Sequence, residues 1–135
     1  MIGLDTNVLV RYMAQDDRKQ SALATLMIEK ELTAAQPGFI STVVLVELCW
    51  VLNSLYSASR DELVGMIDDL LNTPQFQLER REVVQGVIRR AKPGNGRQAG
   101  LADALIAGIA SDEGCTATFT FDKAAVRQAG MSLLA

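Results

Sequence analysis

Short apolar segments with the character of strands alternate along the whole chain with longer segments of helical spacing. Residues 2–4, 39–42 and 76–78 resemble strands, and between them apolar residues recur every three or four positions. This order is typical of βαβ units, so it predicts a parallel sheet with helices on both faces. Because 135 residues suit one domain, we expect a single α/β domain over residues 1–135.

Capping and breaking residues mark the ends of several expected helices. Ser59 and Glu62 form a capping-box pattern that opens a helix reaching Leu71. The other expected helical segments are residues 23–32, 43–55, 83–91, 101–112 and 123–128. Pro93, Gly94, Asn95 and Gly96 interrupt the chain, and residues 116–121 and 131–134 supply further apolar or β-branched segments.

Composition excludes several kinds of chemistry. The chain has no histidine, which rules out a Ser-His-Asp site, His-ligated zinc and an imidazole base. With 13 basic and 16 acidic residues, its net charge of −3 gives no general attraction for nucleic acid, so any such site must be local. Cys49 and Cys115 are far apart in the sequence and are expected to be small buried residues. No apolar stretch reaches the roughly 18 residues of a membrane span and no signal peptide is evident, so we expect a soluble, cytoplasmic protein.

Two aspartates follow apolar segments that are expected to be strands. Asp5 follows residues 2–4, and Asp122 follows residues 116–121. Ligands of open α/β sheets bind at the carboxyl ends of the strands. Because neighbouring strands lie about 4.8 Å apart, carboxylates at these ends can converge on one small volume.

Two further acids interrupt apolar helical segments. Glu47 shares a helix face with Val43, Val44, Trp50 and Val51, which are expected to face the interior. Asp103 lies in a similar apolar setting, and neither acid has a Lys or Arg within one helical turn. A buried lone carboxylate costs several kcal/mol unless a cation compensates it. An alternative is that each acid only caps a helix or accepts hydrogen bonds from backbone amides.

The four acids indicate the class of metal. An all-oxygen set without soft donors favours Mg²⁺ or Mn²⁺. Asn7 and Thr120 each lie two residues from a strand-end aspartate and are candidates for hydrogen bonds that orient the carboxylates or a water molecule. Helix capping or β-propensity explains these two residues about as well.

Four segments resemble the acidic motifs of PIN-domain ribonucleases, in order and at their usual spacing. They are MIGLDTNVL (1–9), STVVLVE (41–47), LADALIA (101–107) and TFTFDK (118–123). The similarity runs the full length and is greatest to the VapC-like toxins of bacterial type II toxin–antitoxin pairs. It implies a small parallel sheet flanked by helices and a catalytic quartet of Asp5, Glu47, Asp103 and Asp122, with Asp5 and Asp103 as direct metal ligands.

The chemistry expected from such a site is in-line hydrolysis of phosphodiesters in single-stranded RNA. A Mg²⁺ held by Asp5 and Asp103 would polarise the phosphate and lower the pKa of a bound water, which Glu47 or Asp122 would orient or deprotonate. A non-catalytic adaptor on the same fold and a metal-dependent phosphatase remain alternatives. A haloacid-dehalogenase-like phosphatase needs a second acid where Asn7 stands, and a response-regulator receiver needs an acidic pair and a late Lys that are not evident.

One segment concentrates the basic residues. It holds six of the 13, namely Arg80, Arg81, Arg89, Arg90, Lys92 and Arg97. We expect Arg89, Arg90, Lys92 and Arg97 to contact RNA phosphates. The alternative is a solvated helix face, since Glu79 and Glu82 stand beside the first pair.

An excess of apolar residues predicts a protein partner. The segments 43–55 and 63–71 carry more apolar side chains than one core-facing stripe can hold, namely Leu45, Leu48, Leu52, Leu55, Leu63, Val64, Met66, Ile67, Leu70 and Leu71. We therefore expect another chain to cover part of this surface. The resemblance implies both a homodimer and a small antitoxin whose basic tail reaches the acidic pocket.

Overall fold

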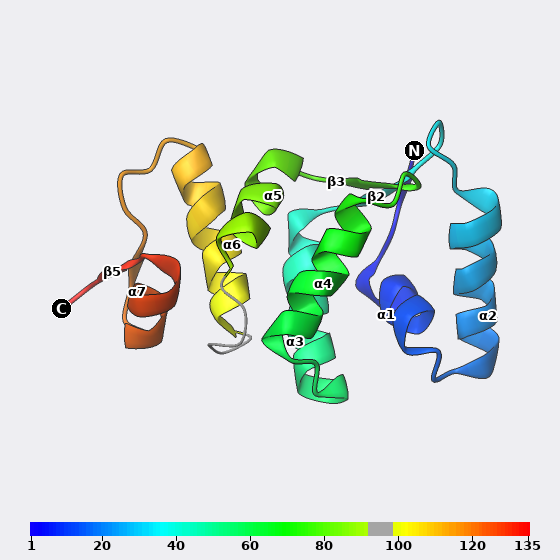
Figure 1. Ribbon diagram of the computed structural model, residues 1–135, viewed down its shortest axis with the longest axis horizontal. Helices are drawn as coiled ribbons and strands as arrows, with labels where there is room; N and C mark the ends of the chain where they lie inside the picture. Colours follow the sequence, from blue (N-terminus) through cyan, green and yellow to red (C-terminus); the bar gives the residue numbers. More distant parts are fainter. Residues whose placement is uncertain (92–98) are drawn as a thin grey trace.

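The computed structural model describes residues 1–91 and 99–135 as an α/β fold, in which most elements are helices (Figure 1). The α-helices are α1 (Thr6–Ala14), α2 (Arg18–Leu26), α3 (Thr42–Tyr56), α4 (Arg60–Leu71), α5 (Arg81–Arg90), α6 (Ala99–Asp112) and α7 (Lys123–Ala129). A π-helical turn, η1 (Met27–Glu31), continues α2. The expected break at residues 93–96, and with it Lys92 and Arg97, lies outside the described residues.

The strands are short, parallel and divided between two sheets. In the first sheet β2 (Gly38–Ile40) lies between β1 (Ile2–Gly3) and β3 (Phe76–Leu78). In the second, β4 (Phe119–Thr120) pairs with β5 (Ser132–Leu133). The α/β class and the parallel pairing expected from the sequence are thus confirmed. The division into two sheets was not expected.

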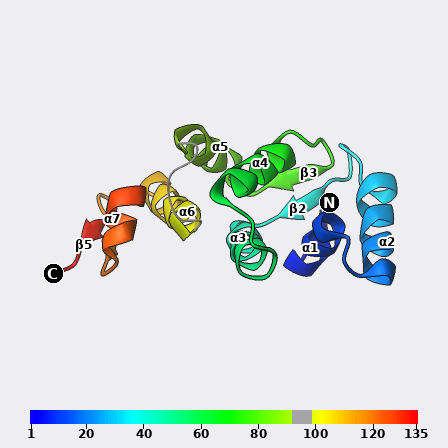
Figure 2. The same cartoon turned by 60° about the horizontal axis from the view of Figure 1, so that its bottom comes forward.

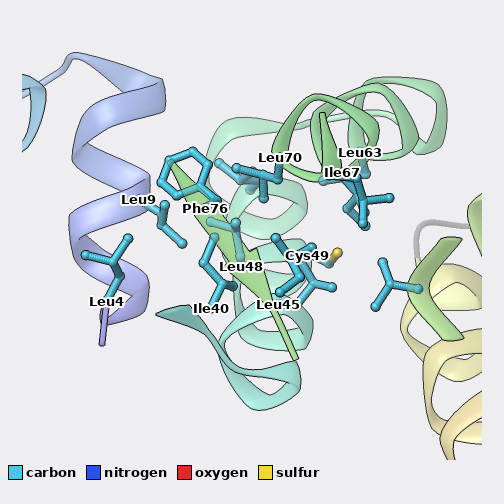
Figure 3. Packing of buried hydrophobic residues seen from close by; sticks show 14 of the residues in the cluster. Leu4, Leu9, Ile40, Leu45, Leu48, Cys49, Leu63, Ile67, Leu70 and Phe76 are labelled. Atoms are coloured by element: carbon cyan, nitrogen blue, oxygen red, sulfur yellow. The ribbon is translucent and has the colours of Figure 1, made fainter. Parts of the chain in front are cut away.

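A single apolar cluster fills the space between the first sheet and the helices that cover it. Leu9 of α1, Leu48 of α3 and Ile67 of α4 are fully buried in it, and Figure 3 shows their side chains meeting those of the strands. Gly38 permits this packing, because a Cβ atom there would lie 2.7 Å from Leu4 and 2.8 Å from Leu32. The cluster continues into α5 and the first two turns of α6.

Polar residues stabilise the starts of two helices, and at one of them they also tie the helix to the end of a strand. The capping box expected at Ser59 is confirmed, with the Ser59 amide donating to Glu62 at 2.9 Å and the Glu62 amide donating to Ser59 at 3.1 Å. At the start of α3 the amide and hydroxyl of Thr42 both donate to Glu79, which follows β3. These bonds hold the pKa of Glu79 below its usual value.

Several expectations about local structure are wrong. Helix α1 was not expected, α2 begins earlier than residue 23, and the expected strand over residues 116–121 is reduced to β4. Cys49 is buried, which raises the pKa of its thiol to about 12, whereas Cys115 is exposed. The reason at Cys115 is that the chain leaves α6 three residues earlier and runs along the surface.

The two ends of the chain lie far apart. Figures 1 and 2 both place α7 and β5 at the opposite end of the molecule from α1 and α2, with α3, α4 and α5 between them. Helix α6 packs closely on α5, where a Cβ atom on Gly108 would lie 3.2 Å from the side chain of Val87. No helix within residues 1–91 or 99–135 is long and apolar enough to cross a membrane.

Candidate active site

Asp5 and Glu47 line one hollow between α1 and α3. Asp5 follows the first strand and caps α1, with its Oδ1 accepting a hydrogen bond of 2.8 Å from the Thr6 amide. Glu47 lies on α3, and Asn7 and Thr6 line the same hollow. Both carboxylates are exposed to solvent. The capping bond restrains Asp5 and leaves its second oxygen available as an acceptor.

Thr6 is a polar residue of this hollow that sequence reasoning missed. Its side chain is only 5% exposed, and its hydroxyl has no hydrogen-bond partner among the described residues. An unpaired buried hydroxyl costs roughly 1–3 kcal/mol, so its place beside the capping acid suggests a ligand or water as partner. The signal available in the sequence was its position directly after a strand-end aspartate.

Asp103 and Asp122 form a second pair, at the other end of the molecule. Asp103 is half-buried on α6, whereas Asp122 is exposed and caps α7 by accepting a 2.8 Å hydrogen bond from the Ala124 amide. Burial raises the pKa of Asp103, and the negative charge of Asp122 raises it further. The hydroxyl of Thr120 accepts from the Asp122 backbone amide at 3.0 Å, so its contact is with the backbone of Asp122 and the orienting role expected for Thr120 stays a prediction.

The four acids are thus arranged as two pairs. No group of three or more acidic or thiol side chains in residues 1–91 and 99–135 lies close enough together to hold one metal ion. The cause lies in the sheets, because Asp5 follows β1 and Asp122 follows β4, and these strands belong to separate sheets. Asp5 and Glu47 line one hollow, and Asp103 lies near enough to Asp122 for the charge of Asp122 to raise its pKa.

The expectation that Glu47 lies on an interior-facing side of its helix is wrong. Val43 is 76% exposed and Trp50 is 53% exposed, so the part of α3 around Glu47 is open to solvent, whereas Val44 and Val51 are partly buried against the core. The opposite side, with Leu45 and Leu48, packs on the sheet instead. The predicted excess of apolar residues on α3 and α4 is likewise mostly absorbed by the core, and Leu55 is the clear exception.

The basic segment divides into structural and exposed residues. Arg80 binds Asp112 at 3.0 Å and Glu113 at 2.5 Å, which raises its pKa. Arg81 donates to the Leu71 carbonyl. Arg89 and Arg90, at the end of α5, are exposed. Of the residues expected to contact RNA, these two are therefore the ones that the structure shows accessible.

The sequence of this chain matches a known protein family. The family described as PIN domain matches residues 2–131, which covers both acid pairs. Domains of this family are typically metal-dependent nucleases. Comparison with curated proteins gave no significant match. Because the family match covers nearly the whole sequence, the chain belongs to the PIN domain family.

Proposed function

We propose that this protein is a Mg²⁺- or Mn²⁺-dependent endoribonuclease that cuts single-stranded RNA and acts as the toxin of a type II toxin–antitoxin pair. The observation that carries the proposal is that Asp5, Glu47, Asp103 and Asp122 form no ion pair with a Lys or Arg in the described part of the chain. Acids that serve only stability are usually paired or fully solvated. Asp103 is neither, since it is half-buried beside another carboxylate.

The residues fit a hard divalent cation. Carboxylate and hydroxyl oxygens are the donors that Mg²⁺ and Mn²⁺ prefer, and the buried hydroxyl of Thr6 beside Asp5 still lacks a partner among the described residues. We propose Asp5 and Asp103 as the direct ligands, which requires that the two acid pairs, separate within one chain, be brought to one place. When bound, the cation would supply Lewis-acid stabilisation of the charge that develops on a phosphate.

The protein side chains would position the substrate and move the proton. The capping bonds from Thr6 to Asp5 and from Ala124 to Asp122 fix the orientation of both carboxylates before any ligand arrives. Glu47 is exposed and free to accept the proton of the attacking water. Asp122 is the alternative base, and the Thr120 hydroxyl holds its backbone in place.

Binding of a single-stranded nucleic acid would rest on local charge. Arg89 and Arg90 are exposed at the end of α5, and Arg90 lines a hollow together with Thr118 and Gln128. A net charge of −3 leaves little general attraction for polyanions, so such a local site would carry the phosphate contacts.

The toxin role rests on an exposed apolar groove beside the first acid pair. Val43, Trp50 and Ile109 line it together with Glu47. An antitoxin helix could bury this apolar surface and place a basic side chain on the Glu47 carboxylate, because an Arg fork competes well for clustered carboxylates.

The test is cleavage of labelled single-stranded RNA and DNA of the same sequence by purified protein. We expect cleavage of RNA with Mg²⁺ or Mn²⁺, and loss of cleavage in EDTA that an excess of Mn²⁺ restores. Induction in cells should slow growth, and co-expression of the neighbouring gene product should relieve it. Unchanged cleavage in EDTA would overturn the metal-dependent assignment, and unaffected growth would overturn the toxin role.

A further inference from the structure

Each sheet has an open edge at a strand that is followed by one of the aspartates, β1 in the first sheet and β4 in the second. On β1 the amides of Ile2 and Leu4 donate to the β2 side, at 3.0 Å each. Because backbone groups of successive residues in a strand point to opposite edges, the N–H and C=O of Gly3 face the open side. In residues 1–91 and 99–135, β1 has no strand partner other than β2.

Strand β4 has a matching edge. The carbonyls of Thr118 and Thr120 accept hydrogen bonds from β5, at 2.8 Å each. The backbone groups of Phe119 and Phe121 therefore face the open side. Their side chains are 64% and 80% exposed. Open edges flanked by exposed apolar residues are a hazard that natural proteins usually cover.

The two edges fit each other in one parallel register. The Gly3 amide can donate to the Phe119 carbonyl while the Gly3 carbonyl accepts from the Phe121 amide, which sets Gly3 opposite Thr120. Two residues further along both strands, Asp5 then stands opposite Asp122. Because paired strands lie about 4.8 Å apart, this register brings the two acid pairs to one sheet edge and joins the three-stranded and two-stranded sheets into one.

The β4 edge of the same molecule is not placed to do this. Helix α6 packs on α5, with Gly108 against Val83 and Val87. Figures 1 and 2 show α7 and β5 beyond α5, on the far side of the molecule from α1 and the N-terminus. A second copy that brings its β4 edge to β1 uses two edges that are unpaired among the described residues, so no strand pairing within either chain has to break. A two-fold axis repeats the pairing, so that the β1 and β4 edges of both copies are covered.

We propose that two copies of this chain pair reciprocally, β4 of each on β1 of the other, so that each active site combines Asp5 and Glu47 of one copy with Asp103 and Asp122 of the other. The inference rests on the proposed nuclease function for the role of the acids. The strand pairing itself does not depend on that function.

Cross-linking tests the pairing without reference to activity. One tagged chain carries Gly3→Cys and a differently tagged chain carries Thr120→Cys, both with Cys115→Ser. A Cβ atom at Gly3 would meet nothing within 4 Å, so the change is tolerated. A short bis-maleimide should link the two tags. Gly65→Cys, which also meets nothing within 4 Å, replaces Gly3→Cys as the matched control and should give no link.

Three outcomes separate the possibilities. A link between the two tags supports the exchange even if no RNA is cut, in which case only the nuclease function fails. A further chain carries both Gly3→Cys and Thr120→Cys. A link that forms only within this chain means that β4 pairs with its own β1, which overturns the proposal. No link in either arrangement means that the edges do not pair, and this also overturns it.

Complementation then tests whether the sites are shared. Asp5→Asn and Asp103→Asn chains should each be inactive alone. When they are co-expressed, half of the dimers are mixed and one of their two sites is intact, so about one quarter of wild-type cleavage should return. Asp5→Asn mixed with Glu47→Gln leaves no intact site and should stay inactive. Absence of recovery in the first mixture, with cross-linked dimer present, would overturn the shared site.

Discussion

The two sheets differ in what holds them in place. The first sheet is embedded in a core of large side chains such as Leu9, Leu48 and Ile67. The second is backed by short helix α7, whose buried residues are Ala124 and Ala125. Each sheet nevertheless presents an aspartate after a strand. The first sheet is therefore stable through its own packing, whereas the second has little apolar burial and gains most from a further strand on its open edge.

The two acid pairs also differ, in how far their carboxylates are exposed to solvent. Asp5 and Glu47 are both solvent-exposed, so water stabilises their charges. Asp103 is half-buried beside Asp122, and its pKa is raised. The cost of bringing negative charge together is therefore concentrated in the C-terminal pair, and a cation shared by both pairs would relieve it mainly there.

The largest expected effect concerns cleavage. Asp5→Asn and Asp103→Asn keep the shape of each side chain and remove its charge. Removal of groups that only orient a metal ligand costs about 10–100-fold, so we expect each substitution to reduce cleavage by more than about 100-fold. Initial rates on labelled RNA in saturating Mg²⁺ provide the measurement.

The control for both variants is Asp68→Asn, which removes an exposed acid of α4, a helix that carries none of the four acids. Its cleavage rate should equal that of the wild type. Strong loss for Asp5→Asn with little loss for Asp103→Asn would show that the C-terminal pair does not take part in the reaction.

The next effect concerns stability and compares the two sheets directly. Leu48→Ala empties a fully buried site in the first core, so the free energy of unfolding should fall by about 2–5 kcal/mol. Met131→Ala, beside β5, removes a side chain that is 7% exposed and should cost less than half as much. Urea unfolding followed by circular dichroism measures both. A larger loss for Met131→Ala would contradict the view that the first sheet carries the main core.

Local signals in the sequence predicted much of this fold. The Ser59–Glu62 box and the alternation at residues 76–78 depend on neighbouring residues only, and both elements are where the sequence places them. Helix α1 was missed because it begins one residue after Asp5 and its polar residues Asn7 and Arg11 obscure the apolar spacing. The four acids as site residues stay a prediction: their places after strands singled out Asp5 and Asp122, whereas the interior setting that singled out Glu47 is wrong.

The sequence could not decide which face of an apolar helix is buried, or which strand edges pair. Helix α3 is apolar on nearly all sides, so spacing alone could not decide whether Leu48 or Trp50 faces the sheet. The structure buries Leu48 and exposes Trp50. Similarly, β1 and β4 are far apart in the sequence, and their apolar residues do not indicate which strand each of them pairs with. The separation of Asp5 from Asp122 follows from that undetermined pairing.

A smaller effect is expected for RNA binding by the exposed end of α5. The double charge reversal Arg89→Glu and Arg90→Glu should weaken binding of an uncut RNA analogue. The slope of log K against log salt should flatten by about 0.7 for each phosphate that the protein no longer neutralises. Lys19→Glu with Lys30→Glu, two exposed reversals on α2 and η1, serves as the matched control. An equal change in slope for both variants would mean that only net charge matters.

The smallest expected effect is on the stability of the metal-free protein as a function of pH. Burial, and then the charge of Asp122, raise the pKa of Asp103, so the folded protein binds this proton more tightly than the unfolded chain does. Its free energy of unfolding therefore falls as pH rises through the raised pKa, and the penalty is complete above it. We expect Asp103→Asn to raise Tm slightly in EDTA at neutral pH. The gain should shrink as pH falls through the raised pKa and vanish below the ordinary pKa of an aspartate. Mg²⁺ in place of EDTA should raise the wild-type Tm more than that of the variant. Thermal melts across pH measure this, and a gain that persists in acid would show that the substitution acts through packing and not through charge.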